Sequence, residues 1–264
     1  MRKYVEISKI IFKAQLVWRF DIAFHMLFTI TKILFAYILW GAIFGEKNEV
    51  AGFTYNTMLS YYIISSFLSQ LDMSNGVSGE ISARIRDGSF SKYMVIPSQV
   101  LGNFIARTAG AAAFYMLFNL AAALVWTVIF RIRLVLTADP AVIVPAVIML
   151  VLGLLFMIQL NFLLGILTFK FQDIGLFLMI KGMMVAFITG TMMPLSLLPP
   201  GIQEGMRLFP FYYVTYLPSM LLVGRNHEEI AAGLISLSVW VLLFIPINRM
   251  AYNRLRIRYD GVGI

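Results

Sequence analysis

The chain has 264 residues, of which 60% are hydrophobic and 13% are charged, and its formal net charge is +8. A soluble domain averages about 45–50% apolar and about 25% charged residues, so this composition excludes both an ordinary soluble protein and a disordered one. The chain has no cysteine, which excludes a disulfide-stabilised domain, thiolate metal sites and a cysteine nucleophile, and a multi-span membrane protein is the class that remains.

The first predicted element is an amphipathic helix at residues 1–19. Its apolar positions recur at steps of three and four, and they are Tyr4, Ile7, Ile11, Ala14 and Trp18. The charged residues Arg2, Glu6, Lys9 and Lys13 fall on the opposite face. A helix with a basic polar face is suited to the interface of the inner leaflet, and no soluble domain follows that would make it an ordinary surface helix. The segment is too charged for a cleavable signal peptide.

Six apolar stretches are long enough for transmembrane helices, since a bilayer needs about 20 apolar residues. They are Phe20–Phe44, Phe53–Met73, Val100–Phe130, Ala141–Phe169, Ile174–Met193 and Ile230–Ile247. The third and fourth exceed this length, so we expect them to tilt or to project into water. No repeat or linker divides the stretches, and the sequence therefore predicts one all-α transmembrane domain over residues 1–264.

The placement of lysine and arginine predicts the orientation. If the N-terminus is cytoplasmic, 15 of the 21 lysines and arginines lie on the inner side and five on the outer side, while Lys32 lies within the first span. Cytoplasmic loops of membrane proteins carry such an excess, so we expect both termini to be cytoplasmic. The basic charge is thereby explained by topology, and we expect no nucleic-acid partner.

The segment Ser74–Gln99 joins the second and third spans on the predicted cytoplasmic side. A short helix from about Ser78 to Asp87 is expected to stop at Gly88, a residue type that commonly follows a helix C-terminus. Its apolar stripe of Val77, Ile81 and Ile85 is followed by Phe90, and its charged residues are Glu80, Arg84, Arg86 and Asp87. Exposed apolar residues rimmed by charges would suit a docking element, although a solvated turn of helix explains the composition equally well.

A segment rich in proline and glycine, Pro194–Arg225, precedes the last span. Its punctuating residues are Pro194, Pro199, Pro200, Gly201, Gly205, Pro210, Pro218 and Gly224, and aromatic residues such as Tyr213 lie between them. Proline and glycine break helices, and irregular backbone at membrane depth is tolerated only where protein or a water-filled cavity covers it. We therefore expect a broken, re-entrant helical hairpin that enters from the outer face. A seventh straight span would put the basic C-terminal tail outside.

Several polar side chains lie within the predicted spans: Lys32, Asn119, Gln159, Asn161 and Lys181. A charge at the centre of a membrane helix costs about 2.5–3.5 kcal/mol, so Lys32 should face a cavity, a partner or another polar group. A polar translocation path through Lys32, Asn119, Gln159 and Asn161 is one interpretation. Hydrogen bonds between helices, or snorkelling of Lys181 toward the interface, are the alternative.

Most catalytic signatures are missing from the sequence. There is no G-x-x-x-x-G-K-[ST] phosphate loop, no G-x-S-x-G elbow and no pair of histidines spaced for zinc, because His25 and His227 are the only two. No close pair of carboxylates lies at mid-membrane depth, which weakens an ion-coupled carrier and an intramembrane hydrolase alike. We expect no catalytic residue, no metal site and no cofactor bound by this chain.

The order of these features resembles the membrane subunits of type-2 ABC exporters over essentially the whole chain, and most of all the small permeases of the viologen-exporter type. The matching segments are Met1–Tyr4, Ile81 with Ile85–Phe90 and Pro97, Pro194–Pro199, Leu208–Tyr213, Tyr216–Pro218 and Arg254–Gly263. The tail departs from the pattern, because relatives often end in a glycine pair where this chain has Gly261-Val262-Gly263-Ile264.

The resemblance implies an export permease that works with a separate ATPase subunit, which would bind ATP and magnesium. The ATPase would dock on the N-terminal helix and on Glu80, Ile81, Arg84, Ile85, Arg86, Asp87 and Gly88. The outer gate would involve Pro194, Pro199, Pro210, Tyr213 and Pro218. Two six-span subunits, identical or not, would rock against each other in the cell membrane. An ATP-independent carrier or channel and a lipid-modifying membrane enzyme are the alternatives, and the substrate is not specified.

Overall fold

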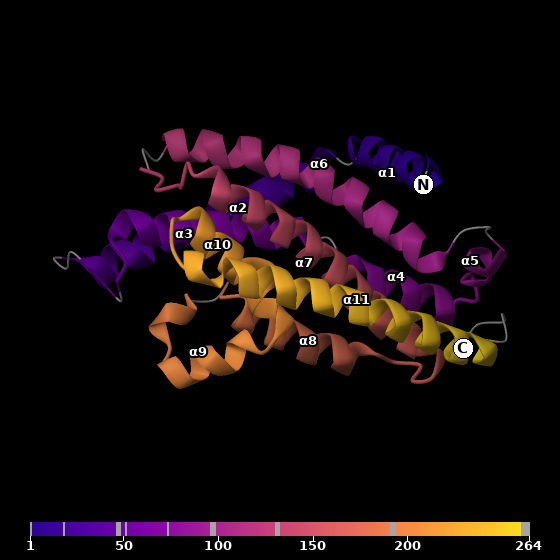
Figure 1. The fold of residues 1–264 in the computed structure, drawn as a ribbon. Helices are drawn as coiled ribbons and strands as arrows, with labels where there is room; N and C mark the ends of the chain where they lie inside the picture. Colours follow the sequence, from indigo (N-terminus) through magenta and orange to yellow (C-terminus); the bar gives the residue numbers. More distant parts are fainter. Residues whose placement is uncertain are drawn as a thin grey trace.

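The computed structural model describes residues 2–17, 19–45, 49–50, 52–72, 74–95, 99–129, 133–190 and 194–259. Their regular structure is helical apart from a single antiparallel bridge between Val50 and Phe53, which confirms the predicted all-α class. The helices are α1 (Arg2–Gln15), α2 (Arg19–Phe44), α3 (Tyr55–Leu71), α4 (Asn75–Arg86), α5 (Ser91–Val95), α6 (Val100–Ile129), α7 (Pro140–Ile166), α8 (Gly175–Ile188), α9 (Pro200–Arg207), α10 (Leu217–Leu222) and α11 (Ile230–Leu255). They form one elongated bundle (Figure 1).

Helices occupy all six of the predicted apolar stretches, as α2, α3, α6, α7, α8 and α11. Within the described residues, three segments are both long and apolar enough to cross a membrane: Val100–Val125, Pro140–Phe169 and His227–Leu255. Helix α8 has only 14 residues, or about 21 Å at 1.5 Å per residue, and is short for a bilayer core of about 30 Å. Three spans are thus supported by length and composition, and the full set of six stays a prediction.

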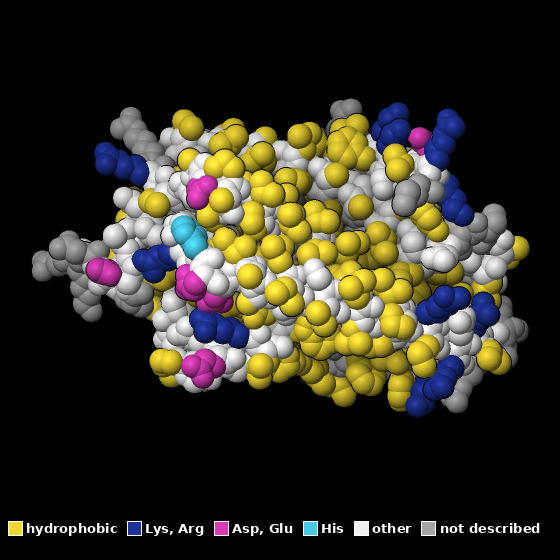
Figure 2. Space-filling model, in the orientation of Figure 1, with side chains coloured by type: hydrophobic (Ala, Val, Ile, Leu, Met, Phe, Trp, Pro, Cys, Tyr) yellow, Lys and Arg dark blue, Asp and Glu magenta, His cyan; other side chains and the backbone are white. Residues whose placement is uncertain are grey.

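The charged side chains gather at the two ends of the bundle. The start of α1 and the end of α11 lie at one end with α5, whereas α9 and α10 lie at the other (Figure 1). Figure 2 shows an apolar band between these ends, with mainly Lys and Arg at the end that carries the termini and acidic side chains gathered at the opposite end. This pattern fits a molecule whose middle lies in lipid and whose termini share one side.

Helix α7 is the centre of the packing. It lies against α11 along most of its length, and α4 and α10 pack against its two ends. It is apolar nearly all round, as expected of a helix that is surrounded by other helices or by lipid. Helix α8 is peripheral by contrast, because Ile188 is its one buried residue while Leu176, Met179 and Met183 are exposed.

Helix α1 packs along the first half of α6. Small residues on α6 allow this approach: a Cβ added to Gly110 would lie 2.3 Å from the carbonyl oxygen of Ser8. The Ser8 Oγ atom donates a hydrogen bond of 2.6 Å to the carbonyl oxygen of Ala106, and Phe12 meets Phe114 edge-on. The inward face of α1 therefore includes Ser8 and Phe12, which the predicted apolar stripe left out.

Other parts of the α1 prediction have mixed outcomes. Tyr4, Ile7 and Ile11 of the predicted apolar face are half-buried, whereas Ala14 of the same face is exposed. Trp18 lies outside the described residues. The charged residues of α1 are exposed, which agrees with a polar face that points away from the bundle. The location of α1 at the inner leaflet stays a prediction.

Candidate functional site

Helix α4 begins three residues earlier than predicted and ends as expected, with Gly88 in the left-handed conformation at φ +77°. Its apolar stripe faces inward: Val77 is 4% exposed, and Ile81 and Ile85 are 0% exposed. A Cβ on Gly165 would lie 2.8 Å from the Cβ of Ile81, so α4 is seated directly on α7. The expectation that these residues form an exposed apolar docking surface is therefore wrong, because α7 covers them.

The exposed side of α4 consists of small and charged residues. Gly79, Ala83, Arg86 and Asp87 are exposed, and Glu80 and Arg84 are partly exposed. An added Cβ at Gly76 or at Gly79 would meet nothing within 4 Å. Packing within the chain therefore gives no reason for glycine at these two helical positions, where it costs about 1 kcal/mol relative to alanine.

A charged cluster ties α4 to α5 and α6. The Glu80 Oε1 atom accepts hydrogen bonds from Arg107 Nη1 at 2.8 Å, Arg84 Nε at 3.0 Å and Tyr93 OH at 3.0 Å. Burial alone would raise the pKa of Glu80, but the hydrogen bonds and charge of Arg107, with those of Tyr93 and Arg84, lower it overall. The Arg107 guanidinium also donates to Tyr93 OH at 2.7 Å. The cluster fixes the position of α4 relative to the start of α6.

The C-terminal segment reaches the end of α4. Tyr259 OH donates a hydrogen bond to the carbonyl oxygen of Gly88 and accepts one from Ser91 N at 3.2 Å. Its ring packs on Phe90 and Phe169, with centroids 6.1 and 5.6 Å away. The tail therefore supports the connection that follows α4, a contact that the sequence pattern alone did not indicate.

A second polar cluster lies where α3, α4, α7 and α8 meet. Asn161 Nδ2 donates to Ser74 Oγ at 2.8 Å, and Asn161 Oδ1 accepts from Lys181 Nζ at 3.1 Å. Lys181 Nζ also donates to Asn75 Oδ1, and the Ser74 hydroxyl donates to Asp72. These hydrogen bonds join different elements of the bundle, as in the alternative weighed for Asn161, and Lys181 takes part in them.

This cluster borders a cavity of about 220 Å³. Asp72 and Lys181 form its polar end, and Val214 and Thr215 of the outer segment lie at the other. A neighbouring apolar cavity of about 310 Å³ between α3, α6 and α7 shares Asp72 and Val214 with it. Residues of the polar cluster and Val214 and Thr215 of the outer segment thus line the same hollow.

The other predicted path residues are not part of this cluster. Asn119 is 2% exposed with an unpartnered Nδ2, and Gln159 is 3% exposed with an unpartnered Oε1. Each of these two buried atoms lacks a hydrogen-bond partner among the residues that the structure describes, a costly state that calls for a partner or water. The side chain of Lys32 lies outside the described part of the chain.

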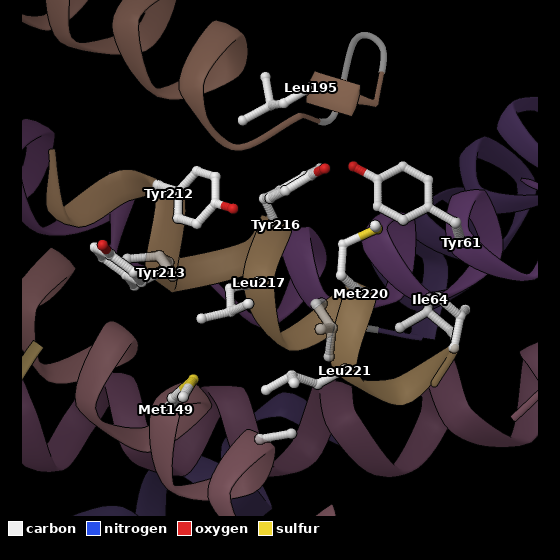
Figure 3. Close-up of a cluster of buried hydrophobic side chains, with 14 of the residues drawn as sticks. Tyr61, Ile64, Met149, Leu195, Tyr212, Tyr213, Tyr216, Leu217, Met220 and Leu221 are labelled. Atoms are coloured by element: carbon white, nitrogen blue, oxygen red, sulfur yellow. The ribbon is translucent and has the colours of Figure 1, made fainter. Parts of the chain in front are cut away.

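The predicted outer segment folds as three short pieces after a 3₁₀ turn. They are α9, a π-helical turn at Tyr212–Tyr216, and α10. Pro210, Tyr213 and Pro218 are buried together with Pro194, whereas Pro199 is exposed. Figure 3 shows Tyr61, Tyr212 and Tyr216 side by side beneath Leu195, with Leu217 and Leu221 pointing toward Met149 of α7. The segment is broken, as predicted, and its second half lies inside the bundle.

One acidic residue anchors this segment. Glu229 accepts hydrogen bonds from Arg207 Nη2 at 2.7 Å, Asn226 Nδ2 at 2.7 Å and Tyr212 OH at 2.8 Å. The start of α11 is thereby joined to both α9 and the π-helical turn.

Of the residues that complete the two polar clusters, sequence reasoning singled out Lys181 but not Ser74, Tyr93 or Arg107. Ser74 and Lys181 contact Asn161, Asp72 contacts Ser74, and Tyr93 and Arg107 contact Glu80. The only signal was the rarity of charged residues within or beside apolar stretches. In the described residues no group of three or more His, Asp or Glu side chains is arranged to hold a metal.

The family model described as ABC-2 family transporter protein matches residues 30–263. No curated protein and no solved structure matches the chain.

Proposed function

The chain belongs to the ABC-2 family of transporter proteins, and on this basis we propose that it forms half of the translocation pathway of an ATP-driven exporter. A family member is a membrane permease subunit, a transport component that is not itself catalytic. ATP and magnesium would be bound by a separate ATPase subunit. The viologen-exporter type and the export direction rest on the resemblance of the sequence.

The exposed face of α4 is the proposed docking surface for the ATPase. We define it as Gly79, Ala83, Arg86 and Asp87, with the partly exposed Glu80 and Arg84 at its edge. Ile81 and Ile85 act from beneath by seating α4 on α7, and Gly88 ends the helix. The open space around Gly79 supports the proposal, since a partner surface can approach the α4 backbone there.

The proposed translocation path begins at the cavity beside Asn161. Lys181 and Asp72 provide its charged lining, and Thr215 connects it with the outer segment. We propose that this segment, with Pro194, Pro210, Tyr213 and Pro218 buried in it, is the outer gate and re-enters the membrane. Asn119, Gln159 and Lys32 stay proposed path residues.

A second permease would complete the pathway. The exposed apolar side chains of α8, such as Leu176, Met179 and Met183, support this proposal, because they can contact either lipid or a partner helix. We propose the cell membrane as the location, with six spans and both termini cytoplasmic. The gathering of lysines and arginines mainly at the end of the bundle that carries both chain termini supports this orientation (Figure 2).

The function is tested by purifying the tagged chain from its own membranes and identifying its partners by mass spectrometry. We expect an ABC ATPase to copurify. Arg86→Glu should reduce its recovery roughly tenfold, because reversing a charge in an interface costs on the order of 1.4 kcal/mol. The exposed Arg254 of α11 offers the matched control, and Arg254→Glu should leave the recovery unchanged. The chain would instead be an ATP-independent carrier or channel if no ATPase is recovered and the purified chain alone moves solute across liposome membranes.

The proposed path makes a separate prediction about water. Gly182 lines the cavity beside Lys181, whereas the adjacent Met183 is 64% exposed on the apolar surface of α8. Because the chain has no cysteine, a single introduced thiol can be labelled without background. A water-soluble maleimide should modify Gly182→Cys roughly tenfold or more faster than Met183→Cys in membranes, since the reactive thiolate forms only in water. Equal rates at the two positions would show that the cavity is not part of an aqueous path.

A further inference from the structure

A pocket of about 510 Å³ lies between the start of α6 and the end of α11, at the end of the bundle that carries both termini. Leu101, Phe162 and Ile245 form its apolar part, and Asn248, Arg249 and Arg256 form its polar part. It is larger than the two cavities beside the proposed path and shares no lining residue with them. The proposed function therefore leaves this pocket without a role.

The charge of the pocket favours an anion. Arg249 and Arg256 are exposed, and neither forms an ion pair with any residue that the structure describes. None of the described residues that line the pocket carries a carboxylate. The first turn of α6 also borders it, and the N–H groups of a first helical turn have no acceptor within the helix. Two guanidinium groups and a helix N-terminus together suit a phosphate.

A buried amide in the pocket wall calls for a hydrogen-bond donor. Asn248 is 1% exposed, and its Nδ2 atom donates to the carbonyl oxygen of Phe244 at 2.8 Å. Its Oδ1 atom is buried without a hydrogen-bond partner among the described residues. An unpaired buried acceptor is costly, and a hydroxyl group on a ligand would satisfy it.

The position of the pocket matches the boundary between lipid tails and water. The predicted third span begins at Val100, and the predicted last span ends at Ile247, so Arg249 and Arg256 lie just beyond the apolar band. Ile245 precedes Arg249 by one helical turn, on the side of the apolar band, and the Phe162 ring lies against Tyr252, between the two arginines along α11. A ligand with an anionic head and an apolar tail would therefore meet matching surfaces at both of its ends.

We propose that this pocket binds an anionic glycerophospholipid of the inner leaflet whose headgroup carries hydroxyls. Arg249 and Arg256 hold the phosphodiester, and Asn248 accepts a hydrogen bond from a headgroup hydroxyl. The acyl chain starts along Phe162 and Ile245. The bound lipid would join the start of α6 to the end of α11, the helix that leads into the tail contact at Tyr259.

The test is a titration of the purified, delipidated chain with phosphatidylglycerol, followed by native mass spectrometry. The double variant Arg249→Gln with Arg256→Gln should weaken binding about tenfold or more, because each charged hydrogen bond contributes substantially. Arg254→Gln is the matched control, since Arg254 is also exposed on α11 but does not line the pocket. The proposal is wrong if the double variant binds phosphatidylglycerol as tightly as wild type does. It is also wrong if Arg254→Gln loses as much affinity as the double variant.

Two further probes test whether the headgroup hydroxyl contributes to binding beyond the charge, and whether the ligand is a lipid or a soluble phosphate. Phosphatidylmethanol carries the same charge without a headgroup hydroxyl, so wild type should prefer phosphatidylglycerol about three- to tenfold, and Asn248→Leu should remove this preference. An unchanged preference in Asn248→Leu would contradict the role of Asn248. Glycerol 1-phosphate should not displace the lipid at equal concentration; displacement would assign the site to soluble phosphates instead. None of these measurements depends on an ATPase or on transport, so their outcome is independent of the proposed function.

Discussion

Ile81→Asp is expected to prevent the chain from folding. Ile81 is 0% exposed and lies against Gly165 of α7, so the new carboxylate would be buried in an apolar interface without a partner. An unpaired buried charge costs several kcal/mol, and the lost isoleucine packing adds about 2–5 kcal/mol. Folded proteins are stable by only about 5–15 kcal/mol in total. Size-exclusion chromatography of the tagged chain in detergent should show little or no monodisperse protein.

Ala83→Asp provides the matched control on the same helix. Ala83 is exposed, so the same carboxylate should change the stability of the fold by no more than about 0.5 kcal/mol. Normal yield from both variants would contradict the inward orientation of Ile81. From the sequence alone, Ile81 would be an exposed docking residue whose replacement leaves the chain in the membrane, and the burial of its side chain reverses that expectation.

Glu80→Ala is expected to have the second largest effect. The change removes the one carboxylate that accepts hydrogen bonds from Arg107, Arg84 and Tyr93. Arg107 would then remain half-buried in α6 without its charged partner, at a cost of about 2–3 kcal/mol. The thermal midpoint of the purified chain should fall accordingly. Glu6→Ala removes the carboxylate of the exposed ion pair with Lys9 and should shift the midpoint very little.

The same residue predicts an effect of pH. The folded structure lowers the pKa of Glu80, so ionised Glu80 stabilises the fold fully above its unfolded pKa of about 4.3. This stabilisation is lost as the pH falls through the lower, folded value. Stability of the wild type should therefore decline more steeply below about pH 4 than that of Glu80→Gln. Parallel acid profiles for the two proteins would contradict the role assigned to the cluster.

The sequence was sufficient to predict where α1, α4 and the six apolar helices lie along the chain, but not what covers each face. The spacing of Val77, Ile81 and Ile85 correctly indicates that α4 has one apolar face. Periodicity is a local property, whereas the partner of that face is Gly165 of α7, far along the chain. The same sequence pattern arises whether an apolar stripe packs against its own chain or binds another protein. Only the fold distinguishes the two cases.

The polar clusters, like the apolar face of α4, could be predicted from the sequence only in part. Asn161 stands out in the sequence because an amide within an apolar stretch is unusual. Its partners Ser74 and Lys181 lie on other helices, and no spacing rule connects them. In the outer segment, proline and glycine correctly predict that the helix is broken. They do not predict that Tyr212–Tyr216 forms a buried π-helical turn, because that depends on packing against α3, α7 and α11.

The close seating of α4 on α7 has a mechanical consequence. Helix α7 has 27 residues and is about 40 Å long, with α4 against its C-terminal end at Gly165 and the π-helical turn against its middle at Gly153. Ile81 and Gly165 are in close contact, so a displacement of α4 would be transmitted directly to α7 and would tilt it as a rigid body. A tilt of about 5° over such a helix length would move its far end by roughly 3–4 Å. That displacement is about the diameter of a water molecule, which would be enough to open or close the proposed outer gate.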